Sequence, residues 1–222
     1  MPRSDWHLLL EPQGCSGPEN MARDAVLLTE ADRTGAAFLR LYCWDPPCLS
    51  LGRNDPAIAR PGGRVATVRR PTGGRAVWHE HEVTYAVAAP IAMFGRLREA
   101  YRAIHERLAT ALRSLGADVT LAEDRPTARL HDRPTACFAA TVGGEVLAAG
   151  RKVIGSAQVR RGAAFLQHGS ILLDGSNDTP NATTLRQVLG RPVTFEEVTA
   201  AIVAAWGEPL GSDADLAPLA AG

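Results

Sequence analysis

The sequence is short of lysine, of net charge and of long apolar runs. Lys152 is its only lysine, and its 24 basic side chains balance 24 acidic ones. A protein that binds nucleic acid needs a basic surface, so this balance argues against that class. No run reaches membrane-spanning length and the first residues do not follow a secretory pattern. We therefore expect a cytoplasmic protein that binds neither nucleic acid nor membrane.

Cysteine is also scarce, with only Cys15, Cys43, Cys48 and Cys137 in the chain. Four residues separate Cys43 from Cys48, a spacing that fits neither a CxxC redox pair nor half of a zinc finger. In a reducing compartment all four are expected to be free thiols. Cys43 and Cys48 are expected to pack as small apolar side chains.

Apolar residues make up 45% of the chain, which is enough to build a core. We expect one domain over residues 1–207 and a weakly ordered tail over 208–222. Helical spacing and capping residues predict helices at 20–32, 96–115, 183–189 and 194–206. Asn20 is the expected N-cap of the first, Gly35 its C-terminal glycine, and Thr194 with Glu197 a capping box for the last.

Runs rich in β-branched and aromatic residues predict a larger number of strands. Strands and helices do not alternate strictly, so the pattern indicates an α+β fold with a mixed β-sheet flanked by helices. The expected strands cover residues 6–10, 37–44, 48–51, 65–68, 76–78, 83–88, 119–121, 146–149, 153–158 and 164–172.

One motif runs from Arg69 to His79 and contains a glycine pair, Gly73-Gly74. Glycines allow the backbone to approach a ligand, and successive N–H groups in such a turn form a nest for an anion. The guanidinium groups of Arg69 and Arg70 would help to hold a phosphate or carboxylate. The alternative is a plain β-hairpin with a Gly-Gly turn. The motif alone leaves both interpretations open.

A second motif, Gly150-Arg151-Lys152, is followed by small residues on the same predicted strand, Gly155, Ser156 and Ala157. Small residues on a strand often mark a place where a ligand approaches the backbone. The lysine is either an ordinary surface residue or a half-buried functional one, and its apolar neighbours favour the second.

Cys137 stands between an arginine-rich polar segment and the last group of strands. A buried structural cysteine is the simpler interpretation. If Cys137 lies near Lys152, however, the ammonium group would favour the thiolate, which can accept an acyl group and form a thioester.

His79 and His81 alternate on a predicted strand and so would share a face, beside Glu80 and Glu82. Two histidines do not complete a zinc site, although His168 could supply a third ligand. We favour His79 as a ligand-binding or orienting residue and expect no metal. His7, His105 and His131 have no partner pattern and are expected at the surface.

Together these motifs resemble the lipoate–protein ligase A and lipoyl-octanoyl transferase family. The resemblance covers roughly residues 6–190, and the order and spacing of its motifs make it specific. The matching motifs are Asn20-Met21-Ala22, Trp44-Asp45-Pro46-Pro47, Leu49-Ser50-Leu51-Gly52-Arg53, Arg70-Pro71-Thr72-Gly73-Gly74 with His79 and Thr84-Tyr85, Gly150-Arg151-Lys152 with Gly155-Ser156-Ala157-Gln158, and His168-Gly169.

The resemblance implies a fold like that of the biotin protein ligase catalytic domain, with an acyl-chain tunnel beside the glycine turn. It places Lys152 at the reactive carbonyl. The implied substrate-binding residues are Arg70, Thr72, Gly73, Gly74, Arg75, His79, Gly155, Ser156, Ala157, His168 and Gly169.

The family contains ATP-dependent ligases and octanoyltransferases, and three features favour transfer. Because the sequence stops soon after the catalytic domain, we expect it to lack the accessory domain that ligases usually need. Cys137-Phe138 matches the nucleophile motif of the transferases that resemble ligase A. Arg75 stands where many ligases carry a third glycine. The resemblance therefore implies Cys137 and Lys152 as catalytic residues.

In the implied reaction, octanoyl-acyl carrier protein is the donor. A lipoyl domain, of a glycine-cleavage H protein or a dehydrogenase E2 component, is the acceptor. We expect a monomer that uses no cofactor. Two alternatives stay open: an ATP-dependent lipoate ligase, and a non-catalytic module that binds an acyl group or a carrier protein.

Overall fold

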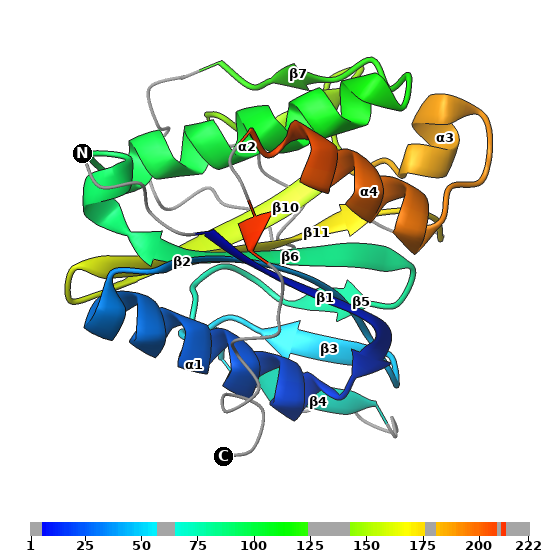
Figure 1. Ribbon diagram of the computed structural model, residues 1–222. Helices are drawn as coiled ribbons and strands as arrows, with labels where there is room; N and C mark the ends of the chain where they lie inside the picture. Colours follow the sequence, from blue (N-terminus) through cyan, green and yellow to red (C-terminus); the bar gives the residue numbers. More distant parts are fainter. Residues whose placement is uncertain (1–5, 57–64, 124–142, 176–180, 208–209, 212–222) are drawn as a thin grey trace.

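A mixed six-stranded sheet forms the centre of the molecule (Figure 1). The computed structural model describes residues 6–56, 65–123, 143–175, 181–207 and 210–211. The sheet order is β10 (Ile154–Arg161), β11 (Ala164–Leu172), β6 (Glu82–Pro90), β2 (Ala37–Trp44), β1 (Trp6–Cys15) and β12 (Leu210–Gly211). β1 runs parallel to β2 and β12, whereas the pairs from β2 to β10 are antiparallel. This confirms the expected α+β class.

Two three-stranded sheets complete the β-structure. In the first, β3 (Cys48–Leu51) lies between β4 (Ala66–Arg69) and β5 (Val77–His79), parallel to β4 and antiparallel to β5. The glycine motif therefore joins two strands that flank a third, and the plain-hairpin interpretation is wrong. The second sheet consists of β7 (Thr120–Leu121), β8 (Val146–Ala148) and β9 (Arg151–Lys152).

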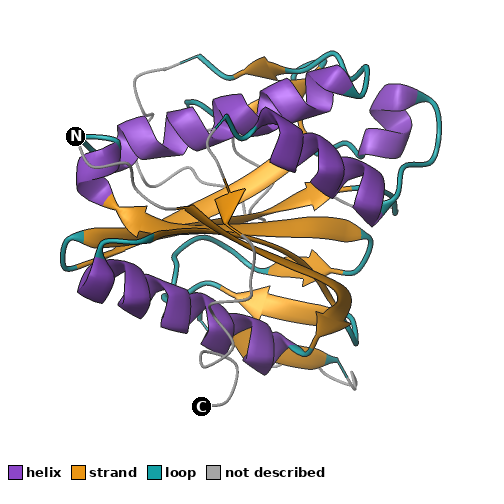
Figure 2. Ribbon diagram, in the orientation of Figure 1, coloured by secondary structure: helices purple, strands orange, loops and turns teal. Residues whose placement is uncertain are grey.

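Helices cover the two faces of the large sheet unequally (Figure 2). On one face lie α1 (Gly17–Thr34) and the β3–β5 sheet. On the other lie α2 (Leu97–Ser114) and α4 (Phe195–Ala205), with α3 (Leu185–Leu189) and the short 3₁₀ helix η1 (Ile91–Met93) at the periphery. Each layer has its own core. None of the described helices combines the length and the apolar character of a membrane span.

Alternation along the central strands assigns side chains to the two layers. In β6, Ala86 and Ala88 pack in the α1 layer, whereas Tyr85, Val87 and Ala89 pack in the α2 layer. β6 and β11 lie inside the sheet and both of their faces are covered. Their sequences are therefore nearly continuous apolar runs. The helix predicted over 96–115 is confirmed, and Ile104, Leu108, Ala111 and Leu112 on its apolar face are fully buried.

The first helix begins one turn earlier than predicted. Ser16 is the N-cap, and it forms a capping box with Glu19, while Pro18 lies in the first turn. Asn20 is thus inside the helix, where its side chain donates to the carbonyls of Cys15 and Cys43. The helix ends as expected at Gly35, which adopts φ 78°.

The last helix has the predicted cap but not the full capping box. The Thr194 hydroxyl accepts from the Glu197 amide, whereas the Glu197 carboxylate pairs with Arg191 at 2.6 Å. Further on, Leu210 and Gly211 pair with Trp6 and His7, inside the stretch expected to be a weakly ordered tail.

Candidate active site

The glycine turn is held in place by its two arginines. Arg69 donates to the carbonyl of Gly52 at 2.8 Å, and Arg70 donates to the carbonyl of Gly73 at 3.0 Å. Arg70 also donates to the carbonyl and the hydroxyl of Ser50, each at 3.0 Å. Both guanidinium groups therefore bind the protein's own backbone, and Arg70 couples the turn to β3.

Gly52 and the glycine turn touch backbone to backbone. A Cβ added at Gly52 would overlap the carbonyl oxygen of Gly74, whereas one added at Gly73 would meet no described atom within 4 Å. We expect Gly52→Ala to lower the free energy of unfolding by about 1–3 kcal/mol, because the turn must shift away. Gly73→Ala is the matched control, expected to change stability by less than about 0.5 kcal/mol. Urea unfolding of both variants measures this, and equal stabilities would contradict it.

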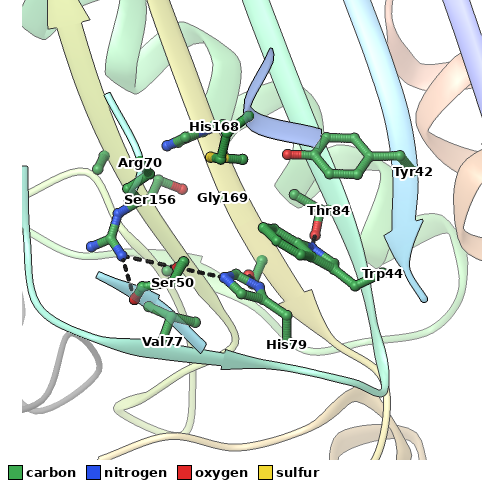
Figure 3. A pocket seen from close by; sticks show the side chains of 14 residues that line it. Tyr42, Trp44, Ser50, Arg70, Val77, His79, Thr84, Ser156, His168 and Gly169 are labelled. Atoms are coloured by element: carbon green, nitrogen blue, oxygen red, sulfur yellow. Dashed lines mark hydrogen bonds between the residues drawn. The ribbon is translucent and has the colours of Figure 1, made fainter. Parts of the chain in front are cut away.

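A pocket lies beside this turn, between α1, the large sheet and the β3–β5 sheet (Figure 3). It contains many of the predicted binding residues: Arg70 and His79 from the first motif, and Gly155, Ser156, Ala157, His168 and Gly169 from β10 and β11. The other lining residues are Met21, Tyr42, Trp44, Ser50, Val77, Thr84 and Ser170. The two motifs, far apart in sequence, thus build one cavity.

His79 is fixed in this pocket by contacts on three sides. Its Nδ1 lies 2.8 Å from Glu82 Oε1 and its Nε2 lies 2.7 Å from the Ser50 hydroxyl. Trp44 stacks on the imidazole, with 3.9 Å between ring centroids and an angle of 10°. Because the Glu82 carboxylate only accepts, His79 Nδ1 carries the proton of the neutral ring, and Nε2 accepts from the Ser50 hydroxyl. The Ser50 oxygen also accepts from Arg70.

His168 has a similar pair of contacts. Its Nδ1 lies 2.8 Å from the carboxylate of Asp24, and its Nε2 lies 2.7 Å from the hydroxyl of Thr72 in the glycine turn. Asp24 also accepts from Arg40 at 2.8 Å. Burial acts to raise the pKa of Asp24, but His168 and Arg40 outweigh it and hold the pKa below its usual range. Asp24 is therefore an anion that orients His168.

A second polar cluster, formed by Ser156, Tyr85 and His105, lies next to Gly169 of the pocket. A Cβ at Gly169 would overlap the hydroxyl of Ser156, which lies 2.6 Å from the Tyr85 hydroxyl and 2.8 Å from His105 Nε2. His105 Nδ1 lies 2.7 Å from the carbonyl of Gly144, which can only accept, so Nδ1 carries the proton. The cluster links a pocket residue to the turn that precedes Glu145.

His105 was expected at the surface, and this expectation is wrong. It is fully buried on the apolar stripe of α2, one turn after Tyr101 and one turn before Leu108. Burial lowers its pKa from 6.5 to about 4, and the nearby charge of Lys152 adds to the effect.

This pKa predicts a loss of stability in acid. In the unfolded chain His105 is protonated below about pH 6.5, whereas in the folded chain it is protonated only below about pH 4. Between these values the unfolded state binds more protons, so acid favours unfolding. At about 1.4 kcal/mol per pH unit, the loss is about 3 kcal/mol across this interval. Denaturant unfolding at several pH values measures it, with His105→Gln expected to flatten the profile by that amount. Parallel profiles for both proteins would contradict the assignment.

Lys152 lies in β9 and is not among the residues that line the pocket. It is only 2% exposed, and its Nζ donates to Glu145 Oε1 at 2.8 Å. The expected half-buried lysine is therefore a fully buried member of an ion pair. Cys137 lies outside the described residues, so its distance from Lys152 stays a prediction.

His79 and His81 do not share a face as predicted, because β5 ends at His79 and the chain turns. The His79 side chain is 7% exposed, and that of His81 is 60% exposed. Across the described part of the chain, no three His, Cys, Asp or Glu side chains are grouped to hold a metal.

Sequence reasoning did not predict which residues orient the site. Asp24, Ser50 and Glu82 each contact a predicted histidine, and Glu145 pairs with Lys152. A weak signal existed for Asp24, which is an acidic residue on the buried face of an amphipathic helix. Ser50 lies in one of the motifs that carry the family resemblance, but nothing in the sequence indicated that it contacts His79.

Comparison with solved structures identifies the class of fold. A bi-partite lipoate protein ligase from Thermoplasma acidophilum superposes with a TM-score of 0.69 at 19% identity, over 98% of this chain and 90% of that one. A lipoate-protein ligase A bound with ATP gives 0.74 at 18% identity, over 98% and 92%. The fold is thus that of lipoate ligase catalytic domains.

The chain belongs to the lipoyl protein ligase A/B catalytic domain family, whose match covers residues 16–182. Among curated relatives, the octanoyltransferase LipM of Moorella thermoacetica is 42% identical, over 80% of this chain and 68% of that protein. The octanoyltransferase LipM of Kyrpidia tusciae is 37% identical, over 93% and 88%. That of Bacillus subtilis is 36% identical, over 80% and 69%.

Proposed function

We propose that this protein is an octanoyltransferase of protein lipoylation. The observation that carries the proposal is its identity of 42% and 37% with two LipM octanoyltransferases, over 80% and 93% of its length. The buried lysine and the pocket beside the glycine turn fit that activity. In the proposed reaction, octanoyl-acyl carrier protein is the donor and a lysine of a lipoyl domain is the acceptor.

In the proposed first step, the Cys137 thiolate attacks the carbonyl carbon of the donor thioester. A new C–S bond forms, and the carrier-protein thiolate leaves and takes up the proton released by Cys137. Exchange between two thioesters is nearly neutral in energy, so the protein contributes mainly positioning. No ATP is required, because the donor is already activated.

Lys152 supplies the positive charge for this step. An ammonium group near a thiol favours the thiolate, and it also stabilises the oxyanion of the tetrahedral intermediate. Burial strengthens both effects, because little water screens a group that is 2% exposed. Glu145 accepts from Nζ at 2.8 Å and holds the ammonium group in place.

The pocket is the proposed site of the octanoyl chain. Gly155 and Ala157 present almost no side chain to the cavity, and Met21 and Val77 add apolar surface. The turn formed by Thr72, Gly73, Gly74 and Arg75 would close its mouth. The acceptor is a lipoyl domain of an H protein or an E2 component, and we propose that the protein acts as a cytoplasmic monomer.

Intact-protein mass spectrometry tests the proposal. The protein is incubated with octanoyl-acyl carrier protein in the absence of ATP. An added octanoyl group that hydroxylamine removes is the expected result, because hydroxylamine cleaves thioesters. Absence of this adduct, together with an adenylate formed from lipoate, ATP and magnesium, would contradict the proposal and favour the ligase.

A further inference from the structure

The proposed function leaves one proton-transfer step without a group to perform it. A lysine side chain has an ordinary pKa of about 10.4, so at pH 7 only about one acceptor in two thousand is a free amine. Lys152 does not serve as the base while it is an ammonium paired with Glu145, since an ammonium has no lone pair. His105 is a weak base, because burial lowers its pKa to about 4.

We propose that Ser50, His79 and Glu82 form a proton relay that deprotonates the acceptor lysine. This inference rests on the proposed function and adds a role for three residues of the pocket. The Ser50 hydroxyl accepts from Arg70 and donates to His79 Nε2, so one lone pair remains to accept an N–H from an incoming amine. The His79 Nδ1–H donates to Glu82, which fixes the tautomer with Nε2 free to take a proton.

Glu82 presents a buried carboxylate directly to the imidazole of His79. Glu82 is buried, and its Oε1 accepts from Thr84, from Ser170 at 2.8 Å and from His79. Its Oε2 has no hydrogen-bond partner, and among the described residues no arginine or lysine pairs with it. The Glu82 carboxylate is therefore placed to hold the Nδ1 side of the imidazole while Nε2 takes up the proton. Trp44 stacks on the ring and fixes its orientation.

The second histidine of the pocket has a different setting. Asp24, which orients His168, also pairs with Arg40 at 2.8 Å, whereas among the described residues no arginine or lysine pairs with Glu82. Arg70 reaches His79 through Ser50, and Cys48 is its register partner on β3. Glu82 is thus the anion that directly contacts His79.

The proposed step balances as follows. The lysine ammonium gives one proton through the Ser50 hydroxyl to His79 Nε2, and the imidazolium later releases it to solvent. The free amine attacks the thioester carbonyl, so a C–N bond forms and the C–S bond breaks. The second proton lost by nitrogen passes to the leaving thiolate. The products are the amide and the free thiol.

The two half-reactions separate this role from a structural one. The protein is first acylated with octanoyl-acyl carrier protein, and the adduct is then mixed with an E2 lipoyl domain or with hydroxylamine, which is unprotonated at pH 7. His79→Asn and Ser50→Ala are expected to slow transfer to the lipoyl domain about 100-fold or more at pH 7. The readout is the ratio of the two rates for the same pre-formed adduct: the rate with the lipoyl domain divided by the rate with hydroxylamine should fall about 100-fold in both variants.

The pH profile gives an independent readout. Without the base, transfer by His79→Asn should rise about tenfold per pH unit between pH 7 and 9, following the free-amine fraction of the acceptor. Glu82→Gln should behave in the same direction. His81→Asn and Glu80→Gln, on the adjoining exposed turn, are the matched controls and should keep wild-type rates.

Three results would overturn the relay. Equal slowing with the lipoyl domain and with hydroxylamine would indicate a structural role. An unchanged lysine transfer rate in Ser50→Ala and His79→Asn would exclude a base. If wild type forms no thioester, the proposed function fails. Wild type and His79→Asn are then compared with synthetic octanoyl-adenylate as the acyl donor in place of octanoyl-acyl carrier protein. Equal rates of lipoyl-domain modification by wild type and His79→Asn would then reject the relay as well.

Discussion

Cys137→Ser is expected to abolish octanoyl transfer, with a fall in rate of at least about a thousandfold. A serine hydroxyl at neutral pH is far less nucleophilic than a thiolate, and a neighbouring ammonium does not ionise it. The measurement is transfer of octanoyl from the acyl carrier protein to a lipoyl domain, together with the mass of the intact protein. The variant should show neither product nor adduct.

Cys43→Ser is the matched control, because its side chain is a half-buried thiol of the same protein. Burial raises the pKa of the Cys43 and Cys48 thiols, which disfavours their thiolates. Transfer by Cys43→Ser should equal that of wild type. Full activity of Cys137→Ser, or an adduct that survives in it, would contradict the covalent scheme.

Loss of Lys152 is the second change with a large expected effect. Lys152→Met should slow formation of the octanoyl adduct by about 10²–10⁴, since both thiolate formation and oxyanion stabilisation lose their cation. The pH dependence of Cys137 alkylation by iodoacetamide gives a second measurement. Its midpoint should move to higher pH in the variant, because the thiol no longer has a positive neighbour.

The single substitution also removes the ion-pair partner of buried Glu145, and breaking a buried pair costs about 3–5 kcal/mol of stability. The double variant Lys152→Met with Glu145→Gln removes both charges and should recover most of that stability. It should remain as slow as the single variant. A near-normal rate in the folded double variant would exclude the catalytic role of Lys152.

Most of the fold could be predicted because its signals are local. Periodic apolar residues predicted α2 within one residue at each end, and the β2, β3 and β11 bounds agree with the structure. The start of α1 was misplaced although Ser16, Pro18 and Glu19 carry a standard capping signature. Strand pairing could not be predicted in this way. The position of β3 between β4 and β5 depends on contacts between residues far apart in the chain, which no short window of sequence contains.

The residues of the site also fall into a group that the sequence could predict and a group that it could not. Short motifs marked His79, His168 and the small residues of β10, and the structure places them around one pocket. Their carboxylate and hydroxyl partners were missed, because Asp24 is 144 residues from His168 and Ser50 is 29 residues from His79. Such pairs exist only after the chain has folded, so their chemistry is a property of packing rather than of a motif.

The burial of Lys152 bears on whether the enzyme can acylate itself. An enzyme that acylates lysine must avoid modifying itself, and this chain contains a single lysine whose side chain is 2% exposed. Arginine provides the rest of its positive charge, and a guanidinium remains protonated and does not act as an acyl acceptor at neutral pH. The chain therefore offers no accessible ε-amino group to compete with the acceptor domain, and amine-reactive labels should leave the ε-amino group of Lys152 unmodified in the folded protein.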